Sequence, residues 1–337
     1  MADVTIYDVA KAAGVSVATV SRIMKNPEVV KPETRERVRK VITEMNYQPN
    51  ALAQQLRTQQ TNMIIVIVPD IGNTFYHEII RGIESEAEAN GYQVLIADLK
   101  GQPSLEKHYV KSIQRHQVDG IISISASMAE RLLEIVAGDY PFVMVVQGID
   151  REDVPNITID NATAARKMMS HLISLGHREI AHITSAEELP LYQERLKGYI
   201  AALEANGIPV EEELIRKGES SIRGGYEQME ILIRKQKKFS AVFAAGDTMA
   251  IGAIKALKDN GLSVPEDCAV TGFDDIDLAS FFEPALTTVR QPKRQMGELA
   301  FRKLLAKIKK ESIQDIRTVL PYEIVIRDSC GYLKHLQ

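Results

Sequence analysis

Cysteine is scarce in this sequence, and the signals of secreted and membrane proteins are missing. The two cysteines, Cys268 and Cys330, lie far apart and form no CxxC pair, which predicts a reduced cytoplasmic chain with unpaired thiols. The first residues lack the basic and apolar segments of a secretory signal. Apolar runs are shorter than the ~18 residues that would span a bilayer. We therefore expect neither secretion nor a membrane partner.

Catalytic motifs are lacking too. The sequence has no GxGxxG, Walker or GxSxG motif and no HExxH spacing. His171, His177 and His182 are close in sequence, but they are predicted on a helix, at its end and on a strand. This placement favours hydrogen-bonded structural histidines over metal ligands. We expect no enzymatic activity, no metal and no cofactor.

Charge is distributed unevenly along the chain. The 337 residues are enough for two or three domains and carry a formal net charge of −4. Residues 1–60 nevertheless hold nine Lys and Arg against six Asp and Glu, whereas residues 61–337 hold 32 against 39. A small basic head on an acidic body is predicted, and a basic head is typical of a nucleic-acid partner.

The head is predicted to contain three short helices around a small apolar core. They cover residues 6–13, 17–24 and about 32–45. Thr5 can cap the first helix, with Asp8 completing a capping box, and Ser16 can cap the second. Gly14 breaks the chain between them, and a glycine-containing turn of this length is typical of a helix-turn-helix unit.

A plain packing hairpin would explain two helices around a glycine equally well. Thr19, Ser21 and Arg22 on the second helix, together with the basic third helix, favour DNA binding. Arginine commonly reads guanine O6 and N7, and hydroxyls suit phosphates or bases.

A short segment follows the head helices. Asn50 can cap a helix over residues 51–57, but seven residues are too few for an isolated helix, so we expect it to order only on binding. Leu52 and Leu56 have no obvious core. They are either incidental linker residues or, for Leu56, a wedge that enters the DNA minor groove and bends the duplex.

The body predicts strands that alternate with helices. Strands are predicted at 63–68, 93–97, 120–125, 142–146, 180–184, about 214–217, 241–245 and 268–273. Helices are predicted at 75–90, 105–116, 129–136, 161–175, 192–206, 222–234 and 248–260. The alternation restarts after residues 156–160, which indicates two similar α/β lobes with parallel sheets. A helix at 293–309 and a strand at 321–326 are expected to cross back between the lobes.

Polar residues follow several of these strands. They are Asp70, Asp98, Ser125, Asp160, Asp247 and Asp274. Ligands of parallel α/β sheets bind at the carboxyl ends of strands, so a ligand cleft between the lobes is predicted there. Asp160 and Asp247 also precede helices, and a capping role explains each of them equally well.

Four motifs occur in an order that resembles the LacI/GalR family of bacterial transcription regulators. They are Thr5-Ile-Tyr-Asp-Val-Ala, Val15-Ser-Val-Ala-Thr-Val-Ser-Arg22, Tyr47-x-Pro-Asn50 and Ala53-Gln-Gln-Leu56. The resemblance extends over the whole chain. It implies an all-α helix-turn-helix head plus an α/β core of two similar lobes, like a periplasmic binding protein. The implied domains are 1–48 (helix-turn-helix), 49–61 (hinge helix and linker) and 62–337 (effector-binding and dimerisation core), with an N-lobe of about 62–160 and 292–320 and a C-lobe of about 161–291 and 321–337.

The resemblance also implies roles for single residues in DNA binding. Phosphate contacts are implied for Tyr7, Ser16, Thr19, Ser21 and Thr34. Base contacts are implied for Val17, Ala18 and Arg22, and a hinge helix for Asn50, Ala53 and Leu56, with Leu56 as the wedge. Thr5 and Tyr47 complete the predicted DNA-binding set. The pair Val17-Ala18 resembles that of galactose and catabolite-control regulators, which suggests a palindromic operator with a central CG step.

In the core, the resemblance implies an effector site formed by residues from both lobes. Its predicted members are Phe75, Tyr76, Ser125, Leu191, Arg195, Asp247 and Asp274. Core packing is the alternative for the two aromatics. An arginine and two carboxylates beside an aromatic wall suit a sugar or a nucleoside, because carboxylates accept from vicinal hydroxyls and a ring covers an apolar face. Leu189-Pro-Leu-Tyr192 is most similar to the cytidine/nucleoside-type branch of the family.

The sequence therefore predicts a cytoplasmic transcriptional regulator that represses from double-stranded operator DNA under allosteric control by a small sugar-like or nucleoside-like effector. No leucine heptad follows the core, which favours a homodimer over a coiled-coil tetramer. The alternative is a solute-binding or sugar-processing protein that uses the same two-lobed core without DNA regulation.

Overall fold

The computed structural model describes residues 4–47, 60–100, 109, 113, 115, 117–125, 140–148 and 151–331. The chain forms two compact units, Met1–Thr61 and Asn62–Gln337. The predicted hinge residues Asn50, Ala53 and Leu56 lie outside the described residues, as do most of the helix predicted at 105–116 and all of the one predicted at 129–136. The finer domain boundaries given above stay predictions.

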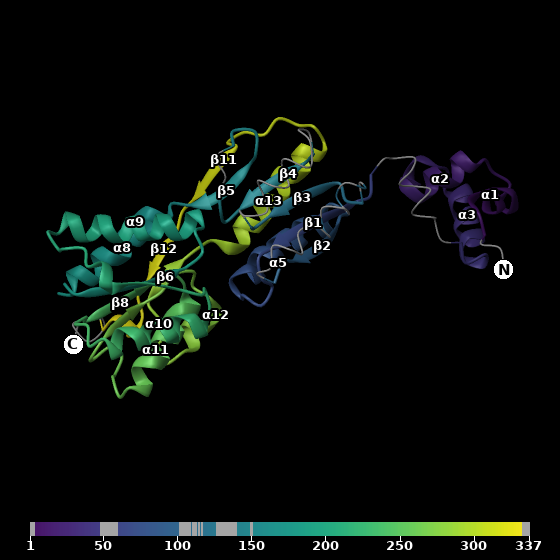
Figure 1. The fold of residues 1–337 in the computed structure, drawn as a ribbon. Coiled ribbons are helices and arrows are strands. Elements are labelled where there is room, and N and C mark those ends of the chain that lie inside the picture. The colour runs from purple at the N-terminus through teal and green to yellow at the C-terminus, as the bar shows by residue number, and fades with distance from the viewer. Residues whose placement is uncertain are drawn as a thin grey trace. The chain divides into compact units, whose positions relative to one another are not determined.

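The unit Met1–Thr61 contains the three predicted helices, in purple in Figure 1. They are α1 (Ile6–Ala13), α2 (Val17–Lys25) and α3 (Pro32–Glu44), with the 3-10 turn η1 (Pro27–Val29) between α2 and α3. Thr5 and Asp8 form the predicted capping box, and the Ser16 side chain accepts from the amide of Thr19. Gly14 has φ 61°, a left-handed conformation that glycine adopts without a steric penalty.

The apolar faces of the three helices meet in a small core. Its fully buried members are Val9, Ala10, Ala13, Val20, Ile23 and Val38. These residues recur at helical spacing in each segment, so the sequence pattern alone placed them on the inner face. The opposite faces of α2 and α3 are thereby left to carry the polar and basic side chains.

The N-lobe of the second unit is built on a six-stranded parallel sheet with strand order β11-β5-β4-β3-β1-β2. The strands are β1 (Met63–Val68), β2 (Gln93–Asp98), β3 (Gly120–Ser123), β4 (Phe142–Val145), β5 (Asn156–Ile159) and β11 (Arg317–Leu320). Helices α5 (Phe75–Ala89) and α13 (Lys293–Ile308) pack against each other, and α13 also packs on β3, β4 and β5 (Figure 1). The inner strands are buried on both faces, as their continuous apolar runs predict.

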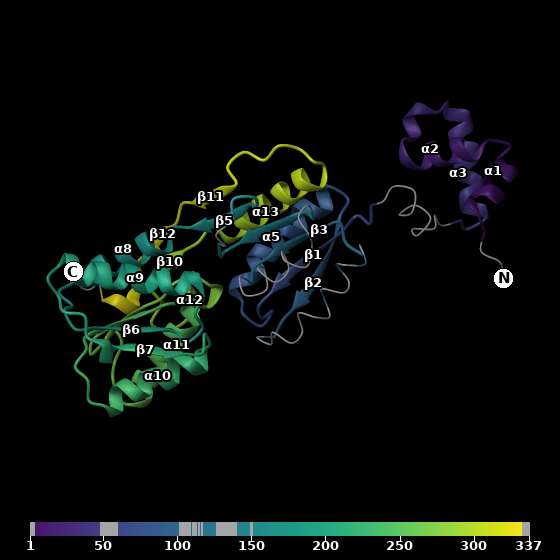
Figure 2. The same ribbon diagram turned by 45° about the horizontal axis from the view of Figure 1, so that its top comes forward.

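The C-lobe is built on a four-stranded parallel sheet with strand order β7-β6-β8-β9. The strands are β6 (Ile180–Ser185), β7 (Ile215–Gly218), β8 (Ala241–Ala244) and β9 (Ala269–Thr271). The helices are α8 (Asn161–Ser174), α9 (Pro190–Ala205), α10 (Ile222–Arg234), α11 (Asp247–Asp259) and the short α12 (Asp277–Phe281). The pair α8 and α9 covers one face of this sheet and the pair α10 and α11 the other, as Figure 2 shows.

Three segments connect the lobes. The chain passes from β5 to α8, from β10 (Thr288–Arg290) to α13, and from β11 to β12 (Glu323–Val325). Strands β10 and β12 pair antiparallel beside the C-lobe, so the predicted return of the tail between the lobes is confirmed. The strands β10 and β11 and the helix α12 were not predicted, because elements of three to five residues carry too little periodicity to be recognised.

Among the residues that the structure describes, no helix combines the length and the apolar character needed to cross a membrane.

Candidate ligand site and nucleic-acid interface

Arg195 lies at the centre of a buried polar cluster in the C-lobe. It comes from the second turn of α9, and only 2% of its surface is exposed. Its Nε donates to Oδ1 of Asn161 at 3.0 Å, and its Nη1 donates to the carbonyl of Ala245. Nη2 lies 3.2 Å from Oδ1 of Asp274, and the guanidinium carbon lies 3.6 Å from the ring centroid of Phe273. One side chain thus contacts the first residue of α8, the residue after β8 and the loop after β9.

The predicted residue Asp274 lies in the loop between β9 and α12. Asp274 and Asp275 both have positive φ, at 113° and 48°, which is uncommon for residues other than glycine. Besides Arg195, Nε2 of Gln291 donates to Oδ1 of Asp274 at 2.7 Å. Burial raises the pKa of Asp274, while the positive charges of Arg195 and Lys293 oppose that rise.

The second predicted carboxylate, Asp247, is fully buried. It is the first residue of α11, whose N-cap is Gly246, so the capping role considered for Asp247 is wrong. Its Oδ1 accepts from the hydroxyl of Thr288 at 2.5 Å, and its Oδ2 accepts from the amide of Ile276 at 2.9 Å. Burial and the neighbouring Asp274 raise the pKa of Asp247 well above its usual range. Asp247 therefore fixes the same loop that presents Asp274.

Close packing around Asp247 requires a glycine. A Cβ atom on Gly272 would lie 2.2 Å from Oδ1 of Asp247, far inside van der Waals contact. The motif Gly272-Phe-Asp-Asp is thus explained by the buried carboxylate that it passes. The capping role considered for Asp160, in contrast, is confirmed, because its Oδ1 accepts from the amide of Thr163 at 2.8 Å.

Two tyrosines from different lobes belong to the cluster. Tyr76, in the first turn of α5, is only partly exposed, and burial together with Tyr192 and Asp274 raises its pKa. Tyr192, in the first turn of α9, shares a hydrogen bond of 2.6 Å with the hydroxyl of Ser220. The charges of Tyr192 and Asp274 act on Tyr76, so side chains from both lobes influence one another electrostatically here.

The other predicted effector residues, Phe75, Leu191 and Ser125, are buried and contact neighbouring parts of the protein. Phe75 meets Tyr76 edge to face with ring centroids 5.3 Å apart, and it is buried in the main apolar core. Leu191 is buried in the same core. Ser125 is buried after β3, where its carbonyl accepts from the hydroxyl of Ser123 at 2.9 Å. The structure thus brings Tyr76, Arg195, Asp247 and Asp274 together, and it gives Phe75 and Leu191 packing roles.

Sequence reasoning missed several members of the cluster. Asn161 orients Arg195, Gln291 contacts the carboxylate of Asp274, and Nζ of Lys293 donates to the carbonyls of Asp274 and Asp275. Tyr192 belongs to the motif Leu189-Pro-Leu-Tyr192, but it is absent from the predicted effector set. Gln291 precedes the predicted helix 293–309 and Lys293 begins it, but no local pattern indicates that their side chains reach the loop of Asp274 and Asp275.

Two further predicted strand-end residues organise loops. Oδ1 of Asp70 accepts from the amide of Gly72 at 2.8 Å. Oδ1 of Asp98 accepts from the amides of Ile71 and Lys100 at 3.2 and 3.0 Å. Both carboxylates therefore stabilise turns at the carboxyl edge of the N-lobe sheet.

The histidines have structural contacts. His182 is fully buried between the rings of Tyr199 and Phe243, with centroids 4.9 and 5.0 Å away, and its Nδ1 is 2.8 Å from the carbonyl of Phe243. Burial lowers the pKa of His182 to about 4. Nε2 of His171 lies 3.4 Å from Sγ of Cys330. Within the described part of the chain, no group of three or more acidic, histidine or cysteine side chains could hold a metal ion.

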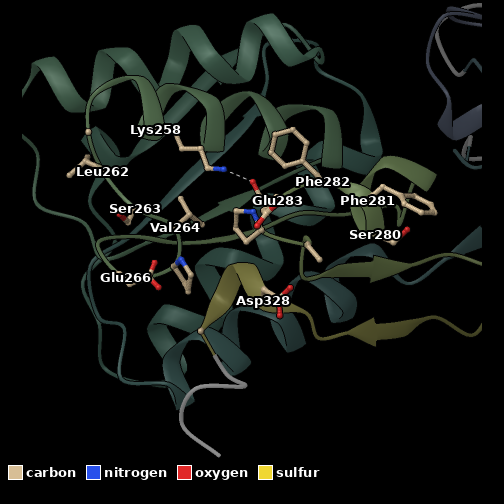
Figure 3. A pocket seen from close by; sticks show the side chains of 15 residues that line it. Lys258, Leu262, Ser263, Val264, Glu266, Ser280, Phe281, Phe282, Glu283 and Asp328 are labelled. Atoms are coloured by element: carbon tan, nitrogen blue, oxygen red, sulfur yellow. Dashed lines mark hydrogen bonds between the residues drawn. The ribbon is translucent and has the colours of Figure 1, made fainter. Parts of the chain in front are cut away.

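A separate groove of about 850 Å³ lies elsewhere on the C-lobe. It runs between the loop after α11 and the loop after α12, and Figure 3 shows Lys258 reaching across it toward Glu283. Val264, Phe282 and Asp328 also line it. None of the predicted effector residues lines this groove, so the cluster around Arg195 and the groove are distinct features.

In the head, the predicted DNA-binding residues divide into those that cap helices and those that face outward. The Thr5 hydroxyl donates to Oδ2 of Asp8 at 2.6 Å, and this interaction lowers the pKa of Asp8. Ser16 and Thr19 share a side-chain hydrogen bond of 2.9 Å at the start of α2. These contacts fix the starts of α1 and α2, and the N-terminus of a helix favours a phosphate group.

The outward set is led by Tyr7, which is 72% exposed. Ala18 and Arg22 are also exposed, whereas Val17 is partly buried against the head core. Ser21, Thr34 and Tyr47 are half-buried, and Tyr47 packs on that core. The outer face of α2 thus carries one small apolar residue, Ala18, and one arginine, Arg22, a pattern suited to a major groove.

A capped helix-turn-helix head and a two-lobed α/β body with a polar cluster at its strand ends define a DNA-binding regulator of the ligand-controlled class. Two family models match this division. Residues 5–50 match the bacterial regulatory proteins of the lacI family, and residues 169–330 match a periplasmic binding protein-like domain. The chain belongs to the LacI family of bacterial regulatory proteins, and it is a transcriptional regulator rather than an enzyme.

Relatives match over nearly their full length. The transcriptional repressor CytR of Escherichia coli K12 is 37% identical over 326 residues, which cover 96% of each chain. The regulator RegA of Clostridium saccharobutylicum is 36% identical and covers 96% of this chain and 98% of the relative. Catabolite control protein A of Priestia megaterium is 36% identical, with coverage of 97% and 99%. The match includes head and body in each case.

Solved structures of the family also match both parts of the chain. The lac repressor dimer bound to operator and the anti-inducer ONPF has a TM-score of 0.86 and 29% identity, covering 98% of this chain and 99% of that one. The complex of the regulator CelR with cellobiose has a TM-score of 0.74 and 31% identity, covering 97% and 99%. The predicted fold class is therefore confirmed.

Proposed function

We propose that this regulator represses transcription as a homodimer on a palindromic operator, and that a neutral sugar or nucleoside bound between the lobes controls it. The observation that carries the effector proposal is the cluster of Arg195, Asp274, Tyr76 and Tyr192, in which side chains from both lobes meet. A ligand at that place can change how the lobes close. Action in the cytoplasm follows from the proposed contact with DNA.

The DNA part of the proposal rests on the outer face of α2, where Ala18 and Arg22 are exposed. We assign base contacts to Val17, Ala18 and Arg22, and phosphate contacts to the hydroxyl groups around them. One head covers only one half-site, so a two-fold dimer is needed to read a palindrome. The operator complex of the related lac repressor dimer supports this arrangement.

The effector part rests on hydrogen-bonding capacity. Gln291 and Arg195 both donate to Oδ1 of Asp274, and we assign Oδ2 as the acceptor for a ligand hydroxyl. The ring of Tyr76 would cover an apolar sugar or base face. Because the carboxylate of Asp274 repels a phosphate group, a neutral ligand fits better than a phosphorylated one. Asp247 would act indirectly, by holding the loop that carries Asp274.

Allosteric control would then be a coupling free energy between the cleft and the head. Effector binding changes lobe closure, and lobe closure changes the separation of the two hinge segments in the dimer. The proposed roles of Asn50, Ala53 and Leu56 in that hinge stay predictions. A solute-binding or sugar-processing role is disfavoured, because full-length relatives that include the head are regulators.

Two measurements test the proposal. A thermal-shift screen of nucleosides, pentoses and hexoses should find a compound that stabilises the wild-type protein and fails with Asp274→Asn. A duplex selected from a randomised library should bind with a steep salt dependence, and the stabilising compound should change that affinity. Selection of no duplex, or a compound that stabilises both proteins equally, would contradict the proposal.

A further inference from the structure

The loop that presents Asp274 is held in an uncommon backbone conformation. Two consecutive non-glycine residues, Asp274 and Asp275, are left-handed, and such backbones persist only where surrounding contacts determine them. The amide of Asp274 donates to the carbonyl of Val289 at 2.9 Å. The contacts that hold this loop therefore decide where the carboxylate of Asp274 points.

Side chains from the last residue of β10, from the segment after β12 and from the start of α13 supply those contacts. Oδ2 of Asp275 accepts from Nε of Arg290 at 2.6 Å, and Oδ1 accepts from Nη2 of Arg327 at 2.7 Å. Lys293 lies two residues after Gln291, and its ammonium donates to the carbonyl of Asp274 at 3.0 Å and to that of Asp275. Hydrogen bonds thus hold the loop both through the carboxylate of Asp275 and through the backbone carbonyls of Asp274 and Asp275.

Lys293 differs from Arg290 and Arg327 because it begins a helix of the N-lobe. It is the first residue of α13, which packs on α5 and on β3, β4 and β5 of the N-lobe. Its side chain reaches back to a loop that follows β9 of the C-lobe sheet. A single ammonium group therefore joins the start of an N-lobe helix to two carbonyls of the C-lobe, beside the proposed effector contact.

We propose that Lys293 is the positioning residue that couples the Asp274 loop to α13, so that a change at Asp274 is transmitted to the N-lobe. The proposal rests on the proposed function in one respect, because the coupling matters for regulation only if the cleft controls DNA binding. Lys293 acts through the loop backbone and not through the ligand. Loss of its two hydrogen bonds should increase the mobility of the loop. It should also widen the range of distances between the two lobes.

The test needs neither effector nor DNA. Spin labels at Glu88→Cys on α5 and Arg223→Cys on α10 report the distance between the lobes by pulsed electron resonance, since both sites are exposed and the native cysteines are buried. In Lys293→Met the distance distribution should broaden, and amide exchange over residues 272–277 should rise about tenfold or more. Lys293→Arg retains a donor and should restore both readouts.

Arg294→Met is the matched control, because it removes one positive charge from the next residue, whose side chain is exposed and pairs with Glu298 on the same helix. It should leave both readouts at the wild-type value. An unchanged distance distribution in Lys293→Met, or faster exchange spread uniformly over the chain, would overturn the proposal. Failure to select a duplex or an effector would instead contradict the proposed function and would leave these distance and exchange results standing.

Discussion

The guanidinium of Arg195 lies against the ring of Phe273 while its Nη2 contacts Asp274, the very next residue. One buried cation thereby fixes both an aromatic side chain and a carboxylate of the same loop. Stacking on an aromatic face and a planar array of donors are properties of arginine that lysine lacks. The position of Asp274, the proposed ligand acceptor, thus depends on an arginine from α9.

Removal of that cation should be costly. In Arg195→Met, the half-buried carboxylate of Asp274 loses its buried cationic partner, and breaking such a pair destabilises proteins by roughly 3 kcal/mol. Arg223→Met removes an exposed arginine that pairs with Glu227, and it should cost at most about 1 kcal/mol. Urea unfolding of the two variants checks the difference, and equal losses would show that the buried pair is not the cause.

His182 should make the protein sensitive to acid. Its pKa is about 4 in the folded protein, against a usual 6.5. Above pH 6.5 it is neutral in both states and contributes nothing. Between pH 6.5 and 4 the unfolded chain takes up a proton that the folded protein refuses, so stability should fall by about 3 kcal/mol over this range.

The measurement is urea unfolding at several pH values in wild type and His182→Phe. Phenylalanine keeps the stacking between Tyr199 and Phe243 and removes the titratable group, so the decline below pH 6.5 should become shallower by that amount. His77→Phe replaces an exposed histidine and serves as the control. A wild-type slope in His182→Phe would assign the acid sensitivity to other groups.

Two glycines near the carboxylates should respond differently to alanine. In Gly272→Ala the new Cβ would lie 2.2 Å from Oδ1 of Asp247, and overpacking of this kind costs about 1–3 kcal/mol. A Cβ on Gly246 would meet Oδ2 of Asp274 at 3.5 Å, an ordinary contact. Gly246→Ala should therefore keep the melting temperature but weaken a ligand that uses that oxygen. Thermal unfolding with and without the compound found in the screen separates these effects.

Arg22 and Arg37 should affect DNA binding in different ways. Arg22 is exposed on α2, where we assign a base contact, so Arg22→Ala should weaken the selected duplex by about 10–100-fold and relax its sequence preference. Arg37 is exposed on α3, and Arg37→Ala should weaken all duplexes by a similar, smaller factor. Fluorescence anisotropy with matched and mismatched duplexes checks both. An unchanged preference in Arg22→Ala would place base reading elsewhere.

Much of the fold was predictable because its signals are local. The capping box of Thr5 and Asp8, the glycine turn at Gly14 and the apolar strand 63–68 each lie within a few residues, and the structure confirms all three. The regular alternation in the body likewise implied two parallel sheets. Short elements such as β10, β11 and α12 were not predicted, because three to five residues do not establish a hydrophobic period.

The candidate site was predictable only in part. Arg195 and Asp274 were predicted, and the structure brings them together across 79 positions of sequence. The family resemblance implies a ligand contact for Asp247, whereas the fold buries this carboxylate and directs its oxygens to Ile276 and Thr288. No local pattern reports burial of this kind, because the partners lie 29 and 41 residues away.

The sequence by itself determined the family, the helix-turn-helix head, the two-lobed body and the chemical types in the cleft. Each of these depends on periodicity, capping or motif spacing, which are properties of neighbouring residues. The tertiary structure decided which carboxylate is buried, which residues hold the loop of Asp274 and Asp275, and that Lys293 joins the two lobes. Those relations depend on where separate chain segments meet, and packing in three dimensions fixes that.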